Sequence, residues 1–540
     1  TQTSAATTDG NSTTGGAINV TVCASVNVTQ NIAATAAAVT ALLTGNASVT
    51  HTGGKVTVTG GTATKDVTVT QSGTVAAVKS TTAGLAGIAA GAVDVLDANR
   101  ASTTAAGTIE TVTLTNAGAA VVNSGALKTL NIGGTLTTVD AGTLGALTTA
   151  ANSTLALNLT GAVSTGAVTI DSDIKTLNVS GNTTASTLNS LVASGATTIN
   201  VSGDAKVTLT GNTTGAVTAI NVTNTKGAVF GTAIGAGVTF TGGAGDDGVV
   251  LSNAFTKAHN MGAGNDSVTY GGAASTTTGA VGSINAGDGT DTIIMTDEQA
   301  AAADGSSAFN ASFTNFEILR ISDAFVENAL DLDGINAVSQ VILAAGVSGT
   351  AAINNLSSGG TVRINADGAA TPALTVGVKS SILGAADVLN LTLSKTGGVL
   401  AAGSVAAPNV ETVNISVPDA AVAPATGSNA VTHTLTLVAT EARTVTVSGN
   451  NGLTLTNTGN TKITNFDASG VVANNTAARP GADATSDSAS SLAVTFTSAN
   501  NTASASVTIT GGAGNDVLTG GAAKDTIVGG AGRDLIDGGA

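Results

Sequence analysis

The chain has 540 residues, only 10% of them charged, and a formal net charge of −16 because acidic residues outnumber basic ones by 34 to 18. This acidity argues against nucleic acid and anionic lipid as direct partners, since both are themselves negative. A mean hydropathy of +0.34 with frequent Val/Thr alternation excludes a disordered chain and predicts strands with Thr on the solvent face. A single cysteine rules out an internal disulfide, and we expect no transmembrane segment because no apolar run is long enough.

Residues 1–240 are rich in Thr, Ala and Val and carry a recurring strand pattern. A Thr-rich lead runs into an aliphatic–Asn–aliphatic triplet, with steps of 27, 20, 22 and 21 between successive Asn residues. One strand pattern per period of this length predicts coils of a β-solenoid. The Asn side chains can point outward or stack inward as a ladder, and the sequence leaves both open. These residues are Asn131, Asn158, Asn178, Asn200 and Asn221. Two Ala-rich stretches, residues 32–43 and 85–96, are expected to be helical.

Residues 241–300 form a first cluster of Gly-Asp turns. Glycine permits tight turns, and carboxylate and carbonyl oxygens are the hard ligands that calcium prefers. Asp247 and Asp266 are nineteen residues apart, close to one coil, and so could face one ion, whereas the step of twenty-five to Asp291 implies an inserted loop. The candidate calcium ligands are the acids, the Asn and the turn glycines: Gly243, Gly245, Asp246, Asp247, Gly262, Gly264, Asn265, Asp266, Gly287, Asp288, Gly289 and Asp291.

Residues 301–490 are expected to be a second β-solenoid region. A short helix is predicted near Asp297–Asp304, at its start. Residues 471–490 are rich in Ala, Asn and Ser and contain a Pro-Gly pair, which predicts a linker or a long loop. The last region, residues 491–540, contains strands and a terminal repeat.

The terminal repeat at residues 511–540 is a nonapeptide of the form G-G-x-G-x-D-x-U-x, where U is a large aliphatic residue that enters the core of a parallel β-roll. Two nonapeptides make one coil, so Asp516 and Asp534 should flank one calcium ion. Asp525 lies on the opposite edge, its upstream counterpart is Val507, and its downstream counterpart would lie beyond residue 540. We therefore expect one complete site, one incomplete site, and a longer parent protein in which the array continues. The candidate ligands here are Gly512, Gly514, Asn515, Asp516, Gly521, Asp525, Gly530, Gly532 and Asp534.

Other acids lie outside these turns. An aliphatic–Glu–Thr–aliphatic motif contains Glu110 and Glu411, and a looser copy contains Glu317. Each Glu is either a solvated edge charge or an additional calcium ligand. The pairs Asp171/Asp173 and Asp331/Asp333 lie in turn-like sequence and are open to the same two interpretations.

The terminal repeats resemble the calcium-binding repeats-in-toxin (RTX) family, which is exported by type I secretion. The chain also resembles the lattice-forming C-terminal part of Caulobacter-type surface-layer (S-layer) proteins, at residues 202–208, 240–247 and 455–461. We therefore expect an all-β fold, an extended right-handed parallel β-solenoid and β-roll with several bound Ca²⁺ ions. The resemblance implies a secreted structural protein that self-assembles into a calcium-dependent lattice on a Gram-negative cell. It also implies lipopolysaccharide binding through an N-terminal domain that is not evident in this chain.

Catalytic motifs are missing from the sequence. His51, His259 and His433 lie far apart, none is part of H-E-x-x-H, and no G-x-S-x-G is present. We therefore expect a protein that is not an enzyme. The alternatives are a secreted RTX adhesin with the solenoid as its stalk, or a calcium-stabilised module of an exported enzyme.

Overall fold

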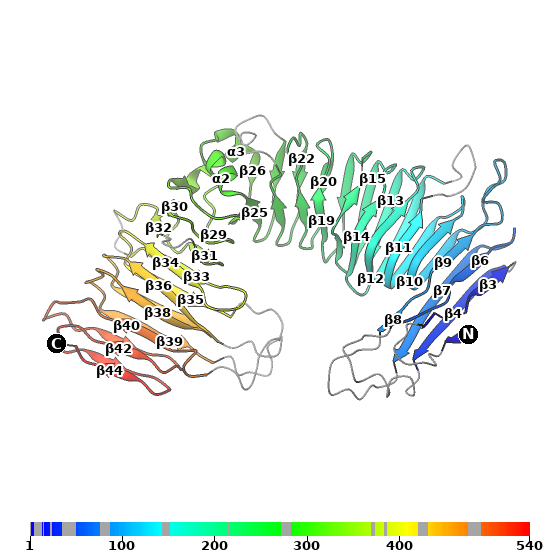
Figure 1. Cartoon of the computed structure of the whole chain (residues 1–540). Helices are drawn as coiled ribbons and strands as arrows, with labels where there is room; N and C mark the ends of the chain where they lie inside the picture. The colour runs from blue at the N-terminus through cyan, green and yellow to red at the C-terminus, as the bar shows by residue number, and fades with distance from the viewer. Residues whose placement is uncertain are drawn as a thin grey trace. The chain divides into compact units, whose positions relative to one another are not determined.

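The computed structural model describes residues 2–4, 13–14, 16–21, 24–34, 50–75, 87–142, 152–213, 215–271, 282–368, 373–382, 386–419, 430–473 and 488–539. They form a nearly all-β chain of parallel strands stacked in successive coils, which confirms the predicted solenoid fold (Figure 1). The chain divides into two compact units, Thr1–Gly271 with Gly282–Gly289 and Gly272–Val281 with Thr290–Ala540. In the part of the chain described here, no helix has the length and apolar character needed to cross a membrane.

The first unit consists of short and long strands joined by turns. They are β1 (Gln2–Ser4), β2 (Thr13–Thr14), β3 (Ile18–Thr21), β4 (Ser25–Ala34), β5 (Thr50–Thr52), β6 (Val56–Thr59), β7 (Asp66–Val75), β8 (Gly87–Ala89), β9 (Val93–Leu96), β10 (Thr111–Asn123), β11 (Thr129–Ala141), β12 (Thr154–Ile170), β13 (Thr176–Gly181), β14 (Ser186–Val192), β15 (Thr198–Gly203), β16 (Val207–Leu209), β17 (Asn212–Thr213), β18 (Ala219–Val222), β19 (Ala228–Ala233), β20 (Thr239–Thr241), β21 (Gly248–Val250), β22 (Ala258–Asn260), β23 (Ser267–Thr269) and β24 (Ser283–Asn285).

Two parallel ladders diverge from the long strand β12, because its first half pairs with β13 and its second half with β14. One ladder continues through β15, β18, β20, β22 and β24, and the other through β16, β19, β21 and β23. Side chains alternate between the core and the outer face, as in β13, where Leu177 and Val179 are fully buried and Thr176 and Asn178 are half-buried. The buried aliphatic residues of successive coils form a continuous core.

The Asn residues of the triplets lie on the outer face, which confirms the first of the two alternatives, and they form ladders there rather than in the core. The Nδ2 group of Asn200 donates to Oδ1 of Asn178 over 2.8 Å, and Asn221 donates to Asn200 over 2.9 Å. Asn158 donates to Asn131 in the same way over 2.8 Å. The ladder is interrupted between Asn158 and Asn178, because β12 and β13 pair with Ala156 opposite Asn178.

The helices predicted for the two Ala-rich stretches are wrong where the structure describes them. Residues 32–34 end β4, and residues 87–89 and 93–96 form β8 and β9. Val93 and Val95 are fully buried at alternate positions and their strand pairs with β6, so cross-strand packing outweighs the helical propensity of the neighbouring alanines. Residues 35–49 and 76–86 lie outside the described residues.

The second unit contains two ladders and a short helical segment. Its strands are β25 (Thr292–Met295), β26 (Phe313–Thr314), β27 (Ile318–Ile321), β28 (Leu330–Asp331), β29 (Gln340–Leu343), β30 (Thr350–Leu356), β31 (Thr361–Ile364), β32 (Ala373–Val378), β33 (Val388–Leu393), β34 (Ala401–Ala406), β35 (Thr412–Val417), β36 (Thr432–Val438), β37 (Thr444–Gly449), β38 (Gly452–Asn457), β39 (Asn465–Val471), β40 (Val494–Thr497), β41 (Thr508–Thr510), β42 (Val517–Thr519), β43 (Thr526–Val528) and β44 (Leu535–Asp537).

Each coil of this unit contributes strands to both ladders. The odd-numbered strands from β25 to β43 pair in succession, and so do the even-numbered strands from β28 to β44. Phe466 of β39 and Phe496 of β40 stack between the ladders with ring centroids 3.9 Å apart. Aromatic packing therefore joins the two sheets just before the terminal repeats.

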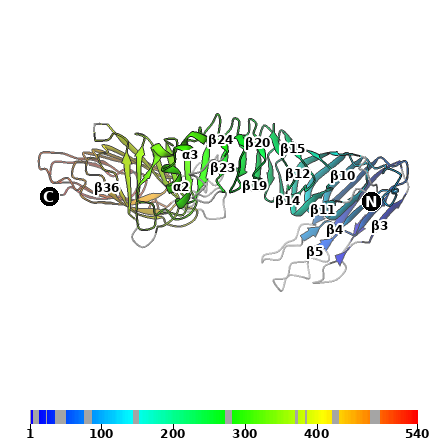
Figure 2. The same cartoon turned by 90° about the horizontal axis from the view of Figure 1, so that it is seen from above.

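The helical segment comprises α2 (Asp297–Asp304), α3 (Ser307–Ser312) and the short 3₁₀ turn η2 (Leu332–Gly334). The predicted helix near Asp297–Asp304 is confirmed, and Thr296 and Gln299 form a capping box at its start. Figures 1 and 2 both place α2 and α3 side by side. Of the predicted linker, residues 474–487 lie outside the described residues, whereas Val471 ends β39.

Candidate calcium-binding turns

The terminal repeats stack with the predicted eighteen-residue period. Val517 of β42 lies opposite Leu535 of β44, and Thr508 of β41 lies opposite Thr526 of β43. The turns that precede these strands therefore stack as well. Asp516 lies over Asp534 on one edge, where the amide of Asp516 donates to Oδ1 of Asp534 over 3.0 Å. The two nonapeptides of one coil contribute to opposite ladders, as the spacing predicts.

The Asp side chain turns inward and binds backbone amides of two coils. Oδ1 of Asp516 accepts from the amide of Val494 in the preceding coil over 2.8 Å, and Oδ2 accepts from Gly512 in its own turn over 2.7 Å. Asp525 repeats this arrangement with the amides of Val507 at 2.8 Å and Gly521 at 2.5 Å. Val507 thus lies at the position predicted from the spacing, and it contributes an amide but no carboxylate.

The glycines allow the backbones of stacked turns to approach closely. Gly530 and Gly532 have φ angles of 95° and 126°, which side-chain-bearing residues rarely adopt. A Cβ atom on Gly530 would lie 2.2 Å from the carbonyl oxygen of Gly512, and one on Gly532 would lie 2.0 Å from that of Gly514. A Cβ on Gly511 would lie 2.3 Å from Oδ2 of Asp516. Because these glycines have no side chains, the carbonyl oxygens of stacked turns and the carboxylate oxygens of the Asp residues can lie close to one another.

The first Gly-Asp cluster adopts the same geometry. Oδ1 of Asp247 accepts from the amide of Ala228 in the preceding coil over 2.7 Å, and Oδ2 accepts from Gly243 in its own turn over 3.0 Å. The amide of Asp247 in turn donates to Oδ1 of Asp266 over 2.7 Å. The pairing of β21 with β23 places these two acids one coil apart, as the nineteen-residue spacing predicts. Residues 272–281, within the longer step to Asp291, lie outside the described residues.

Stacked glycines also recur in this cluster. The φ angles are 98° at Gly262, 128° at Gly264, 103° at Gly287 and 150° at Gly289. A Cβ on Gly262 would lie 2.2 Å from the carbonyl oxygen of Gly243, and one on Gly264 would lie 2.8 Å from that of Gly245. The degenerate turns therefore keep the backbone geometry of the terminal repeats.

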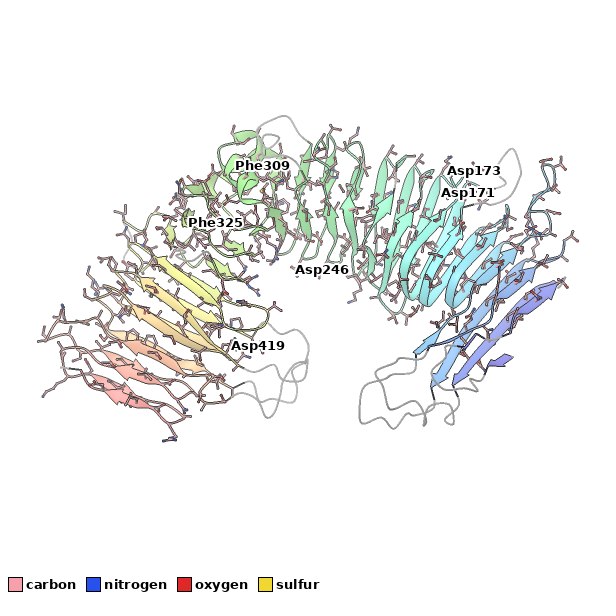
Figure 3. The ribbon with its side chains drawn as sticks, viewed as in Figure 1. Asp171, Asp173, Asp246, Phe309, Phe325 and Asp419 are labelled. Carbon is pink, nitrogen blue, oxygen red and sulfur yellow. The ribbon has the colours of Figure 1, made fainter. Side chains whose placement is uncertain are left out.

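The residue before each inward Asp lies on the outside of its turn. Asp246, at the edge of the stacked strands in Figure 3, is exposed, and its Oδ1 accepts from the amide of Asn265 over 2.8 Å. Asn515 accepts from the amide of Arg533 over 2.9 Å. Asp288 is exposed as well, although it lies three residues before the inward Asp291. The predicted ligand set thus divides into buried or half-buried inward Asp residues and outer residues that join successive turns.

Asp291 belongs to the second unit and is fully buried. Its amide donates to Oε2 of Glu317 over 2.8 Å, so a Glu occupies in the next coil the place that an Asp holds in the nonapeptide turns. The sequence did not identify Glu317 as the stacking partner of Asp291. The available signal was the acid two residues before Leu319, a buried strand residue.

The buried Asp residues are electrostatically unfavourable without a cation. Burial raises the pKa of Asp247 and of Asp516, although backbone amides counteract the shift, and the negative charge of Asp534 raises the pKa of Asp516 further. Among the described residues, no three His, Cys, Asp or Glu side chains come together as a metal-binding group. Paired carboxylates supplemented by glycine carbonyls are instead an all-oxygen donor set, which suits Ca²⁺. The inward Asp residues and the turn carbonyls would hold it.

Glu110 is an edge charge rather than a calcium ligand. Its carboxylate lies 2.5 Å from Nζ of Lys65 and 2.7 Å from Nζ of Lys128. The hydrogen bonds from Lys128 and Lys65 lower the pKa of Glu110 to about 2. Two lysines in the neighbouring coils thus already neutralise this carboxylate.

The acid pairs form capped turns. Asp171 accepts from the amide of Asp173 over 2.8 Å, and the two lie at one edge of the first unit in Figure 3. Asp331 accepts from the amide of Asp333 over 3.0 Å, and Asp333 forms an ion pair with Lys379 over 2.6 Å. These contacts are typical of surface turns.

A comparison with known protein families finds a match in the last part of the chain. Residues 508–540 match the family model of the RTX calcium-binding nonapeptide repeat (4 copies). No curated protein matches the chain. The terminal turns are therefore RTX repeats, which bind several calcium ions, and proteins that carry such repeats are typically secreted. The matched segment includes the strands from β41 to β44.

Proposed function

We propose that this chain is a secreted structural protein that assembles with copies of itself into a calcium-dependent, two-dimensional S-layer on the outside of a Gram-negative cell. The observation that carries the proposal is the continuity of the RTX turns with the second unit. Strands β41 and β43 extend the ladder of odd-numbered strands in this unit, and β42 and β44 extend its ladder of even-numbered strands. Calcium binding at the turns therefore stabilises the same sheets that form the body of this unit.

Calcium acts in this proposal by coupling binding to folding. Where calcium is scarce, as in the cytoplasm before export, the acidic turns repel one another and the chain remains competent for secretion. Millimolar calcium outside the cell binds the folded turns, and the binding free energy adds to the stability of the folded chain. The folded coils then present repeated Thr and Asn side chains on their outer faces, which copies of the chain can contact.

The proposal assigns no catalytic role to this chain. His259 is 3% exposed and accepts a hydrogen bond from the amide of Phe240, and His433 is 1% exposed and accepts one from Leu400. Each imidazole thus has a structural partner inside the solenoid. Attachment to the cell is assigned to lipopolysaccharide, bound by an N-terminal domain of a longer parent protein, as the resemblance to S-layer proteins implies.

Negative-stain electron microscopy of the purified chain tests the proposal. Ordered sheets in millimolar calcium that dissolve in excess EDTA are the expected result, with magnesium at the same concentration as the control for ionic strength. Compact but isolated particles in calcium would contradict it and favour an adhesin or a calcium-stabilised module of an exported enzyme. Equal folding and assembly in EDTA would also contradict it.

A further inference from the structure

Asp387 and Glu411 are stacked in the same way as the acids of the calcium-binding turns. They lie in successive coils, because Val388 of β33 pairs with Thr412 of β35. The amide of Asp387 donates to Oε2 of Glu411 over 2.9 Å. In the same way, the amide of Asp291 donates to the carboxylate of Glu317. In the terminal repeats the amide of Asp516 donates to the carboxylate of Asp534, so there an Asp takes the place of the Glu. No nonapeptide motif marks this position in the sequence.

The Asp387 carboxylate is buried and incompletely satisfied. Asp387 is only 9% exposed, and its Oδ2 atom is buried and has no hydrogen-bond partner among the described residues. A buried carboxylate oxygen without a donor or a cation is costly, because it loses hydration and gains nothing in return. In Asp247, Asp516 and Asp525, by contrast, a backbone amide of the same turn binds Oδ2.

The pair occupies the same corner of the solenoid as Asp525. Strand pairing runs from β33 through β35, β37, β39 and β41 to β43 with the strand starts in register. The residues that immediately precede these strands therefore form one column: Asp387, Glu411, Arg443, Thr464, Val507 and Asp525. Asp387 and Glu411 also share the spacing of the repeats, since Leu389 and Val413, two residues after the acids, are fully buried.

Within the described part of the chain, no ion pair neutralises these two carboxylates. The ion pairs found there are all made by lysines, and none includes Asp387 or Glu411. Arg443 follows Glu411 in the column, and its backbone amide donates to the Glu411 carbonyl over 2.8 Å without an ion pair between the side chains. Glu110, in the same sequence motif, is instead held by two lysines.

We propose that Asp387 and Glu411 bind one calcium ion outside the repeats. Two stacked carboxylates supply the charge that balances a divalent cation, and water and backbone carbonyls complete the oxygen ligands that Ca²⁺ takes. The ion supplies the partner that Oδ2 of Asp387 lacks. This site does not require lattice assembly, because both ligands come from one chain. It adds a calcium-dependent contact between β33 and β35, well before the terminal repeats.

Counting bound ions tests the site. Equilibrium dialysis of the full chain against radioactive calcium gives the number of ions bound per chain, for the parent and for Glu411→Gln and Asp387→Asn. We expect each variant, and the double variant, to bind one calcium ion fewer than the parent. The amide oxygen introduced by Glu411→Gln would still accept from the backbone amide of Asp387, so this variant should fold even if Asp387→Asn does not. Circular dichroism in calcium verifies the fold of each variant.

Glu110→Gln is the matched control, because it makes the same substitution in the same motif. The carboxylate of Glu110 is neutralised by two lysines, so this variant should bind as many calcium ions as the parent. An unchanged count in folded Glu411→Gln overturns the proposal. So does a loss of one ion in Glu110→Gln that equals the loss in Glu411→Gln. The count is made on unassembled chains, so a failure to form sheets leaves this test unaffected.

Discussion

The amide of Asp516 donates a hydrogen bond to Oδ1 of Asp534 over 3.0 Å, one coil further along the chain. Asp516 and Asp525 each accept from an amide of their own turn and from an amide of the preceding coil. A calcium ion between stacked turns would be bound by groups from both. Loss of one Asp should therefore weaken two coils at once, and the effect should depend on whether the stacked position also carries an acid.

Asp534→Asn should reduce calcium affinity more than Asp525→Asn. Asp534 is stacked with a second carboxylate, that of Asp516, whereas Asp525 is stacked with Val507. Removing one of two charges from a complete site should cost tenfold or more in affinity, roughly 1.4 kcal/mol. Calorimetric titration of the two variants with calcium provides the measurement. Equal losses would contradict the pairing of Asp516 with Asp534.

Chelation should unfold the terminal roll before the long strands of the first unit. Strands β41 to β44 have three residues each, and of their aliphatic side chains only those of Ile509 and Leu518 are fully buried. Less apolar burial therefore holds these strands than holds the long strands of the first unit. Calcium at a hundredfold excess over Kd stabilises its folded site by about 2.7 kcal/mol. Hydrogen exchange in calcium and in EDTA should show lost protection in β41 to β44. Unchanged protection in β10 and β11, whose core side chains are buried, is the internal control.

The eighteen-residue period could be predicted from the sequence because it depends only on local turn chemistry. The spacing of Asp516 and Asp534 fixes their stacking, and the aliphatic residue two places later fixes the face that enters the core. The same reasoning located Asp247 over Asp266. The period of the Asn triplets predicted coils but not their exact register, because a two-residue offset between β12 and β13 leaves the spacing almost unchanged.

The roles of the isolated acids could not be predicted, because neighbouring coils determine them. Glu110 and Glu411 lie in nearly identical motifs. Glu110 meets Lys65 from forty-five residues earlier, whereas Glu411 meets the amide of Asp387 from twenty-four residues earlier. A motif specifies where the side chain lies on its own coil, and only the stacking of coils specifies its partner.

Asn200→Ala should destabilise the first unit more than Asn158→Ala. Asn200 forms ladder bonds with both Asn178 and Asn221, whereas Asn158 forms one, with Asn131. At roughly 1 kcal/mol per hydrogen bond, the expected losses are about 2 and about 1 kcal/mol. Urea unfolding of the two variants, followed by circular dichroism, measures the difference. Equal losses would indicate that the ladder bonds contribute nothing beyond local packing.

Glu110 should stabilise the folded chain at neutral pH and lose this effect in acid. Its pKa is lowered from 4.5 to about 2 in the folded state, so the stabilisation is fully present above pH 4.5 and declines as the pH falls toward 2. Comparing the unfolding free energies of the parent and Glu110→Gln across this range isolates the contribution. Side-chain exposures of 57% and 60% for the two lysines predict that added salt will weaken it.

His259 should destabilise the folded chain in mild acid. Burial lowers its pKa from 6.5 to about 4, since desolvation disfavours the imidazolium. A folded-state pKa below the unfolded value means that stability is full above pH 6.5 and falls as the pH drops from 6.5 toward 4. The shift corresponds to roughly 3 kcal/mol once both states are protonated.

An NMR titration of the imidazole measures this pKa directly, and urea unfolding at about pH 7 and about pH 4.5 measures its effect on stability. His259→Gln removes the titrating group, so the difference in unfolding free energy between the two pH values should be smaller in this variant than in the parent. Protonation of carboxylates and of His433 affects both proteins alike and cancels in the comparison. An imidazole that titrates near its ordinary pKa of 6.5, or an equal pH dependence in the variant, would contradict the buried, neutral state of His259.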